Sequence, residues 1–141
     1  MQKLRIGSTL IEFGIRQWQT DYDEEFPVHW CDSLLVITNE HLNYKNSGEF
    51  LCQHEWKEIV EYAEHAVLGE LKTGVKLGFI EPDISFQYFC EGDCSMELTV
   101  HLSEEQGFNG KTSTISFGKN EVEHFLECLK NEIRVARERE M

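Results

Sequence analysis

Basic side chains are scarce in this chain. Of its 141 residues, 13 are Lys or Arg and 26 are Asp or Glu, so the formal net charge is −13. Binding of DNA or RNA requires a basic patch that neutralises phosphates, and an anionic membrane surface would repel an acidic chain. The charge therefore argues against nucleic acid and membranes as partners. It favours a basic partner, which long-range attraction would steer toward the chain. Acidity that serves only solubility stays open as the alternative.

Long apolar runs are also absent. No stretch approaches the ~20 apolar residues of a membrane helix, and the N-terminal residues lack the apolar segment of a signal peptide. The cysteines form an odd and scattered set: Cys31, Cys52, Cys90, Cys94 and Cys128. Such a set is typical of free thiols in a reducing compartment. We therefore expect a cytoplasmic protein.

Signals of a domain boundary are missing too. The chain has only two prolines, Pro27 and Pro82, and no Ser/Gly-rich linker. Its composition is 40% hydrophobic, which is too apolar for a disordered chain. A chain of this length can build its own core. We expect a single domain over residues 1–141.

Apolar residues alternate with a period of two along much of the chain, which predicts strands. The clearest runs cover residues 11–15, 75–79, 84–88, 96–102 and 115–117. Residues 34–37 are apolar on both faces, as in a central strand. Apolar residues on either side of Asn46-Ser47-Gly48 predict a hairpin there. Short connections favour antiparallel pairing, so we expect a mainly antiparallel sheet of about 7–8 strands.

Two segments change to a helical period. Apolar residues at i, i+3, i+4, i+7 and i+11 predict amphipathic helices at about 55–68 and 121–138. Gly69 is a plausible stop for the first helix, and Asn120 with Glu123 resembles a capping box for the second. The predicted fold is α+β, with both helices packed on one face of a single curved sheet. The other face would be open to water or to a partner.

Residues that could carry chemistry do not form a recognisable site. Cys90 and Cys94 have the wrong spacing for a zinc half-site, so a hairpin turn is the better interpretation. Cys31 and Cys52 lie beside His29 and His54, but neighbours in a strand point to opposite faces, which favours core thiols. Phosphate-binding, nucleophile-elbow and zinc-protease motifs are absent. We expect no catalytic residue, no metal and no cofactor, and hence no enzyme, although a small hydrolase with a thiol or metal centre stays a distant alternative.

The acidic residues form two groups that could bind a basic partner. In the first predicted helix they lie opposite the apolar stripe, and in the loop before Pro27 they surround Tyr22. These candidate binding residues are Asp21, Tyr22, Asp23, Glu24, Glu25, Glu55, Glu58, Glu61 and Glu64. Tyr22 and Phe26 would be the apolar anchors, since aromatic residues often dominate binding energy. A solvated helix face and a polar loop are the alternative interpretation.

Several segments resemble a known family. They are the run from His29-Trp30-Cys31 into residues 34–37, the helix start at Glu55-Trp56, residues 75–86 around the Glu81-Pro82 step, and residues 112–135. Together they resemble the WapI-type immunity proteins of bacterial polymorphic toxin systems, from about Ile11 to the C-terminus. Gly78 and the Cys90–Cys94 turn depart from the family pattern.

The resemblance implies a cytoplasmic antitoxin that neutralises the C-terminal toxin domain of a large secreted or surface protein, often a nuclease. Acidity suits this role because a nuclease carries basic groups to bind phosphates. The family provides no binding residues that transfer position by position. We expect a stoichiometric inhibitor that is a monomer or a weak homodimer. The alternative is a self-associating structural or adaptor domain that uses the open sheet face.

Overall fold

The computed structural model describes residues 1–20, 22–25, 27–89, 94–102 and 111–141, with Asp23 described by its backbone alone. These residues form nine antiparallel strands and two helices, which confirms the α+β class. They divide into two compact units, Met1–Glu58 with Glu127–Met141 (unit 1) and Ile59–Leu126 (unit 2). Each unit has its own sheet, so the expectation of a single sheet was wrong. The expectation of a single domain stays a prediction.

Both helices lie within about two residues of their predicted bounds and contribute to both units. They are α1 (Gln53–Val67) and α2 (Lys119–Arg139). Gly69 stops α1, as expected. Its positive φ (71°) turns the chain out of the helix, and its N–H reaches the carbonyl of Ala66 at 3.2 Å. The next N–H, of Glu70, reaches the carbonyl of His65 at 2.8 Å and completes the C-terminal cap.

Each helix has a glutamate in its first turn that accepts the N–H of the residue three positions before it. In α1, Glu55 Oε1 accepts from the Cys52 N–H at 3.0 Å. In α2, Glu121 Oε1 accepts from the Gly118 N–H at 2.7 Å. The predicted cap at Asn120 was therefore two residues late. This is half of a capping box, since neither Cys52 nor Gly118 supplies the usual Ser or Thr oxygen.

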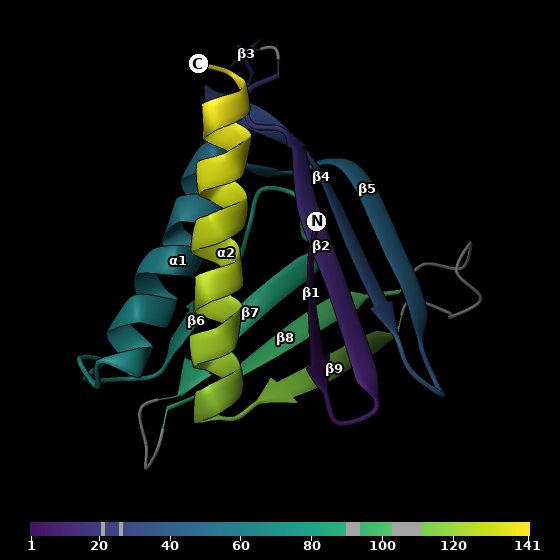
Figure 1. The fold of residues 1–141 in the computed structure, drawn as a ribbon, viewed down its shortest axis with the longest axis vertical. Coiled ribbons are helices and arrows are strands. Elements are labelled where there is room, and N and C mark those ends of the chain that lie inside the picture. Colours follow the sequence, from purple (N-terminus) through teal and green to yellow (C-terminus); the bar gives the residue numbers. More distant parts are fainter. Residues whose placement is uncertain (21, 26, 90–93, 103–110) are drawn as a thin grey trace. The chain divides into compact units, whose positions relative to one another are not determined.

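Unit 1 contains a five-stranded sheet made of β1 (Gln2–Ile6), β2 (Thr9–Gln17), β3 (Tyr22–Asp23), β4 (Val28–Thr38) and β5 (Asn43–Cys52). β4 pairs with β2, β3 and β5, so the prediction of a central strand at residues 34–37 is confirmed. Figure 1 shows the long β2, β4 and β5 side by side. The buried face of this sheet carries apolar side chains, which pack with α1 through contacts such as Phe13 on Trp56, at 6.1 Å between ring centroids.

The hairpin predicted at Asn46-Ser47-Gly48 is wrong. Residues 43–52 form one continuous strand, and the turn lies earlier, where the Asn39 N–H reaches the Leu42 carbonyl at 2.9 Å. Gly48, with φ of +120°, lies at an irregularity of the β4–β5 pairing. A glycine in a polar stretch signals a bulge as readily as a turn, which explains the error.

The edge of β2 is completed by side chains from the end of α2. Pairing of β1 with β2 stops at Gln2 and Phe13. Beyond that point, Glu132 Oε2 accepts the Ile15 N–H at 2.8 Å, and Arg139 donates to the Ile15 carbonyl. Glu140, one residue past the end of α2, accepts the N–H groups of Trp18 and Gln19, which directly follow β2, at 2.6 and 3.0 Å. Charged side chains thus replace a strand neighbour and satisfy backbone groups that an edge would leave unpaired.

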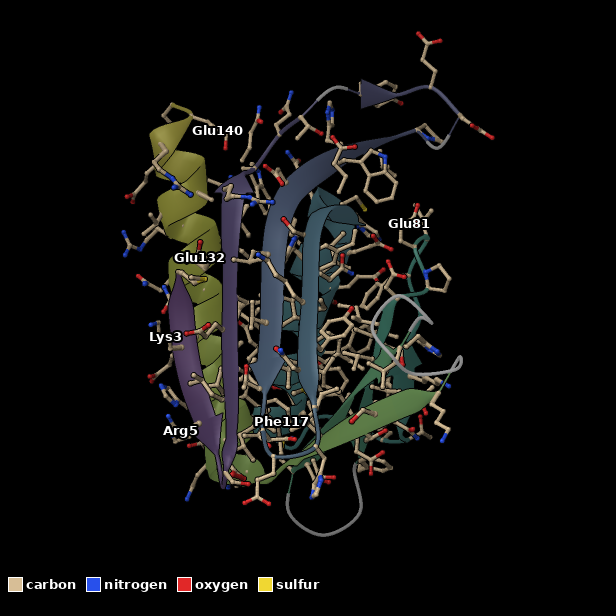
Figure 2. All side chains as sticks on the ribbon, turned by 90° about the vertical axis from the view of Figure 1, so that its right-hand side faces the viewer. Lys3, Arg5, Glu81, Phe117, Glu132 and Glu140 are labelled. Carbon is tan, nitrogen blue, oxygen red and sulfur yellow. The ribbon has the colours of Figure 1, made fainter. Side chains whose placement is uncertain are left out.

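Figure 2 labels Glu132 and Glu140 on and just beyond the helix that runs beside β2. Glu132 is only 4% exposed, and its other oxygen lies 3.2 Å from Gln2 Nε2 and 3.7 Å from the Met1 ammonium group. A buried carboxylate is tolerated only where hydrogen bonds replace its hydration. The Ile15 N–H and the Gln2 amide provide that replacement.

Unit 2 contains a regular four-stranded sheet in sequence order, made of β6 (Val75–Leu77), β7 (Ile84–Phe89), β8 (Ser95–His101) and β9 (Thr112–Phe117). Its strand pairs show no register shift. Aromatic rings fill its core: Phe125 of α2 lies 5.8 Å from Phe86 and 5.4 Å from Phe117 between ring centroids. The buried Tyr88 donates its hydroxyl to the carbonyl of Ile59 at 3.0 Å. Such ring pairs contribute beyond their buried area.

Candidate partner-binding surface

The acidic loop before Pro27 is only partly described. Asp21 and Phe26 lie outside the described residues, and Asp23 has only its backbone described. The Tyr22 side chain is 52% exposed, and its ring centroid lies 5.0 Å from that of His29. Pairing of β3 with β4 holds this tyrosine opposite His29. Glu24 and Glu25 are exposed in the turn that follows.

The acidic face predicted for the first helix is largely present. Glu61 is exposed, and Glu58 and Glu64 are partly exposed. Glu55 is different, because its side chain is 5% exposed and its carboxylate folds back onto the Cys52 N–H. Its inclusion among the surface residues was therefore wrong. A helical projection places a residue on a face, but at the first turn the unpaired N–H groups of the helix attract its carboxylate inward.

A histidine lies at each end of the row of glutamates on α1. His54 Nε2 lies 2.7 Å from Glu58 Oε1. His65 lies between two carboxylates, with Nδ1 2.7 Å from Glu70 Oε2 and Nε2 3.8 Å from Glu61 Oε1. The hydrogen bond that His65 donates to Glu70, helped by the charges of Glu70 and Glu61, raises the pKa of His65 above its ordinary value of 6.5. Protonation of His65 would therefore offset part of the negative charge at this end of α1.

Two surface residues near the end of α1 were not predicted. Leu68, directly after the last helical residue, is 68% exposed, and Glu70 is exposed two residues later. With Glu61 and Glu64 they form what we name the α1 acidic end: Glu61, Glu64, Leu68 and Glu70. Leu68 looks like a continuation of the apolar stripe through Val67. A helical projection places Leu68 off that stripe, and this position could have identified it from the sequence as an exposed apolar residue.

The α1 acidic end belongs to the more acidic of the two units. Unit 2 carries four Lys and twelve Asp or Glu, whereas unit 1 carries nine Lys or Arg and fourteen Asp or Glu. Unit 2 therefore accounts for −8 of the net charge of −13, and unit 1 for the remaining −5. Exposed carboxylates on unit 2 produce the field that a basic partner would meet there.

The cysteines behave as core residues where they are described. Cys31 and Cys52 are buried, which confirms the expectation for these two thiols. Burial raises the pKa of Cys52 to about 11 and raises that of Cys31 further. The Cys31 thiol also donates to the Trp18 carbonyl at 3.0 Å. The thiolate is the reactive form of cysteine, so these thiols are poor nucleophiles at neutral pH.

The predicted turn between Cys90 and Cys94 cannot be compared with the structure, because residues 90–93 lie outside the described part. Cys94 itself is partly exposed. Among the residues that the structure describes, no group of three His, Cys, Asp or Glu side chains is arranged to hold a metal ion. None of the described helices is both long enough and apolar enough to cross a membrane.

Comparison with known proteins gave no match: no family model fits the chain, and no curated protein or solved structure is detectably similar to it.

Proposed function

We propose that the chain is a cytoplasmic immunity protein that binds and neutralises a basic toxin domain by stoichiometric protein–protein contact. The observation that carries the proposal is the α1 acidic end, where the exposed Leu68 is flanked by carboxylates on the more acidic unit. The sequence resemblance to WapI-type immunity proteins supports the same function. Tyr22, with Glu24 and Glu25 beside it, is a second exposed aromatic and acidic surface that could contact the partner.

The arrangement on α1 suits binding better than it suits helix stability. Like charges three residues apart, such as Glu58 and Glu61 or Glu61 and Glu64, cost an isolated helix about 0.2–0.5 kcal/mol per pair. A cationic surface that docks on α1 relieves this repulsion. Leu68 adds apolar area to the contact, and the buried core of an interface is more apolar than its polar rim. The carboxylates then steer the encounter and select a basic partner.

The state of the buried thiols supports a binding function over thiol catalysis. A cysteine nucleophile requires a lowered pKa and access to substrate. Burial gives Cys31 and Cys52 a raised pKa and removes them from the surface. Their place is in the core of unit 1, where they pack beside Trp30 and Leu51 in adjacent strands.

Affinity capture from the native cell tests the proposal. The bait proteins are the wild type, the variant Glu58→Lys/Glu61→Lys/Glu64→Lys, and the control Glu40→Lys/Glu81→Lys/Glu127→Lys, which changes the net charge by the same amount at exposed positions elsewhere. We expect quantitative mass spectrometry to find a basic protein that the wild type and the control retain and the first variant loses. Expression of that protein alone should arrest growth, and co-expression of the wild-type chain should restore it.

Equal retention by both triple variants would show that α1 does not bind the partner. A retained protein that leaves growth unaffected would contradict the antitoxin function while leaving binding intact.

Self-association through the outer face of the unit 1 sheet is the second candidate function. It is favoured by three partly exposed apolar residues on that face, Leu10, Leu34 and Val36. On β2 and β4 these residues lie opposite Thr38 (Leu10), Gly14 (Leu34) and Glu12 (Val36), so no large apolar neighbour on the paired strand covers them. Light scattering over a range of concentrations separates the candidates, because a self-associating domain would show a dimer that Val36→Lys abolishes.

A further inference from the structure

Two irregularities of the unit 1 sheet meet at one polar residue of its central strand, Asp32. In the β2–β4 pairing the register shifts between Ile15 and Gln17, so that Gln17 lies opposite Asp32. In the β4–β5 pairing the register shifts between Cys31 and Ser33, next to the same aspartate. Bulges re-aim side chains and occur preferentially beside functional sites. These two bulges lie on either side of one carboxylate of the central strand.

A hollow of about 500 Å³, open to solvent, lies at this point. Its lining comes from β2 and the segment after it, from β4 and from β5, and consists of Gln17, Gln19, Thr20, Asp32 and Glu49. All five side chains are polar, two of them are carboxylates, and none is cationic. The hollow is open and polar, unlike the enclosed and mainly apolar pockets that hold drug-sized ligands, so it suits a small polar group.

The hydrogen bonds of the lining leave mainly acceptors available. Thr20 donates its hydroxyl to the Trp30 carbonyl at 3.0 Å, and Gln17 donates its amide to the Gln19 carbonyl at 2.9 Å. Arg16 Nη2 lies 2.7 Å from Asp32 Oδ1 and neutralises that carboxylate. Glu49 is exposed and has no ion-pair or hydrogen-bond partner among the described residues. The hollow therefore has one uncompensated negative charge, the second oxygen of Asp32 and the oxygens of two carboxamides, against the amide N–H donors of Gln19 and one of Gln17.

We propose that this hollow binds a guanidinium group. A guanidinium carries one positive charge and five N–H donors in a plane, and no acceptor. This matches a lining that is rich in acceptors and carries one unneutralised carboxylate. An anion would meet Glu49 without a lining cation. A neutral ligand would gain no ionic attraction from Glu49.

The site does not depend on the proposed function, since it lies in unit 1 and uses none of the residues of the α1 acidic end. The guanidinium could belong to an arginine of a protein partner or to a free small molecule. Both sources present the same chemistry to the hollow, and the choice of probes distinguishes them.

Titration of the full chain with small probes, followed by amide and side-chain NMR shifts, tests the proposal. The probes are N-acetyl-arginine methylamide, its neutral analogue N-acetyl-citrulline methylamide, and agmatine. We expect the arginine probe to give saturable shifts at Gln17, Gln19 and Thr20, with a dissociation constant of about millimolar, as a single side chain allows. The citrulline probe should not saturate. Tighter binding of agmatine would indicate a small molecule as the source, and tighter binding of the blocked arginine a protein chain.

The variant Glu49→Gln keeps the shape of the side chain and removes its charge, and we expect it to weaken the arginine probe about threefold to fivefold. Glu40→Gln, at an exposed position of the β4–β5 turn, is the matched control and should bind as the wild type does. Equal binding of arginine and citrulline, undiminished binding by Glu49→Gln, or shifts spread over the chain without saturation would each overturn the proposal.

Discussion

The two units share a plan, an antiparallel sheet with parts of two helices, yet they are stabilised in different ways. Unit 2 has regular pairing and a core of closely packed rings around Phe125. Unit 1 has two bulges and a sheet edge that Glu132, Arg139 and Glu140 complete with charged side chains. Apolar burial is non-directional, whereas a charged side chain on a backbone N–H must be placed accurately. The comparison therefore predicts that truncating a ring matters most in unit 2 and that removing a carboxylate matters most in unit 1.

The largest expected effect is in unit 2. Phe125→Ala removes the ring between Phe86 and Phe117 and leaves a cavity, so the free energy of unfolding should fall by about 3–5 kcal/mol. Urea unfolding measures this change. Phe125→Leu keeps most of the buried volume and should cost clearly less. If the two variants were equally stable, ring packing would not be what holds this unit together.

In unit 1, Glu132→Ala leaves the Ile15 N–H without its acceptor in a buried position. We expect a loss of about 1–3 kcal/mol in the free energy of unfolding. Glu132→Gln keeps a carbonyl oxygen and should lose less. Hydrogen exchange of the Ile15 amide adds a local measurement, since it should speed up more in the alanine variant than in the glutamine variant. Unchanged exchange in both would contradict the edge-completing role of α2.

The two helix caps compare the units directly, because the chemistry is the same and only burial differs. Glu55→Ala removes a buried cap at the start of α1, and Glu121→Ala removes a more exposed cap at the start of α2. Loss of a cap costs about 0.5–2 kcal/mol, and we expect Glu55 near the upper end and Glu121 near the lower end. Thermal and urea unfolding of the two variants would show the difference. Equal losses would mean that burial does not strengthen the cap.

The smallest effect concerns the titration of His65. Its protonated form is held by Glu70 and more weakly by Glu61, so its pKa should lie above 6.5 by NMR titration. Glu70→Gln should lower that pKa more than Glu61→Gln, because its contact is 2.7 Å rather than 3.8 Å. A raised pKa stabilises the fold fully below 6.5, and this contribution is lost as pH rises through the folded value. A larger shift from Glu61→Gln would reverse the assignment.

The sequence predicted those parts of the fold that depend on local periodicity. Both helices, the central strand at residues 34–37 and the stop at Gly69 followed from spacing and from the φ that glycine permits. The hairpin at Asn46-Ser47-Gly48 failed because turn residues and bulge residues are the same in composition. The division into two sheets could not be predicted, since alternation shows that a strand has two faces but not which strand lies beside it.

The candidate surface was predicted in part for a similar reason. Glu58, Glu61 and Glu64 follow from the helical projection, whereas the burial of Glu55 depends on where the helix begins. The contact between His65 and Glu70 depends on the cap at Gly69, which turns the chain back toward the helix. The bonds from Glu132 to β2 and from Glu140 to the residues just after β2 join residues more than 110 positions apart, and no local pattern predicts them.

Association kinetics with the captured partner test the central claim most directly. The on-rate should be measured for the wild type, for Glu58→Lys/Glu61→Lys/Glu64→Lys, and for the control Glu40→Lys/Glu81→Lys/Glu127→Lys, at low and high salt. We predict that the first variant slows association about tenfold or more at low salt and that the control slows it less. High salt should reduce the difference in on-rate between the wild type and the first variant. Equal on-rates for the two variants, or a wild-type rate that salt leaves unchanged, would contradict recognition of a basic partner by the glutamates of α1.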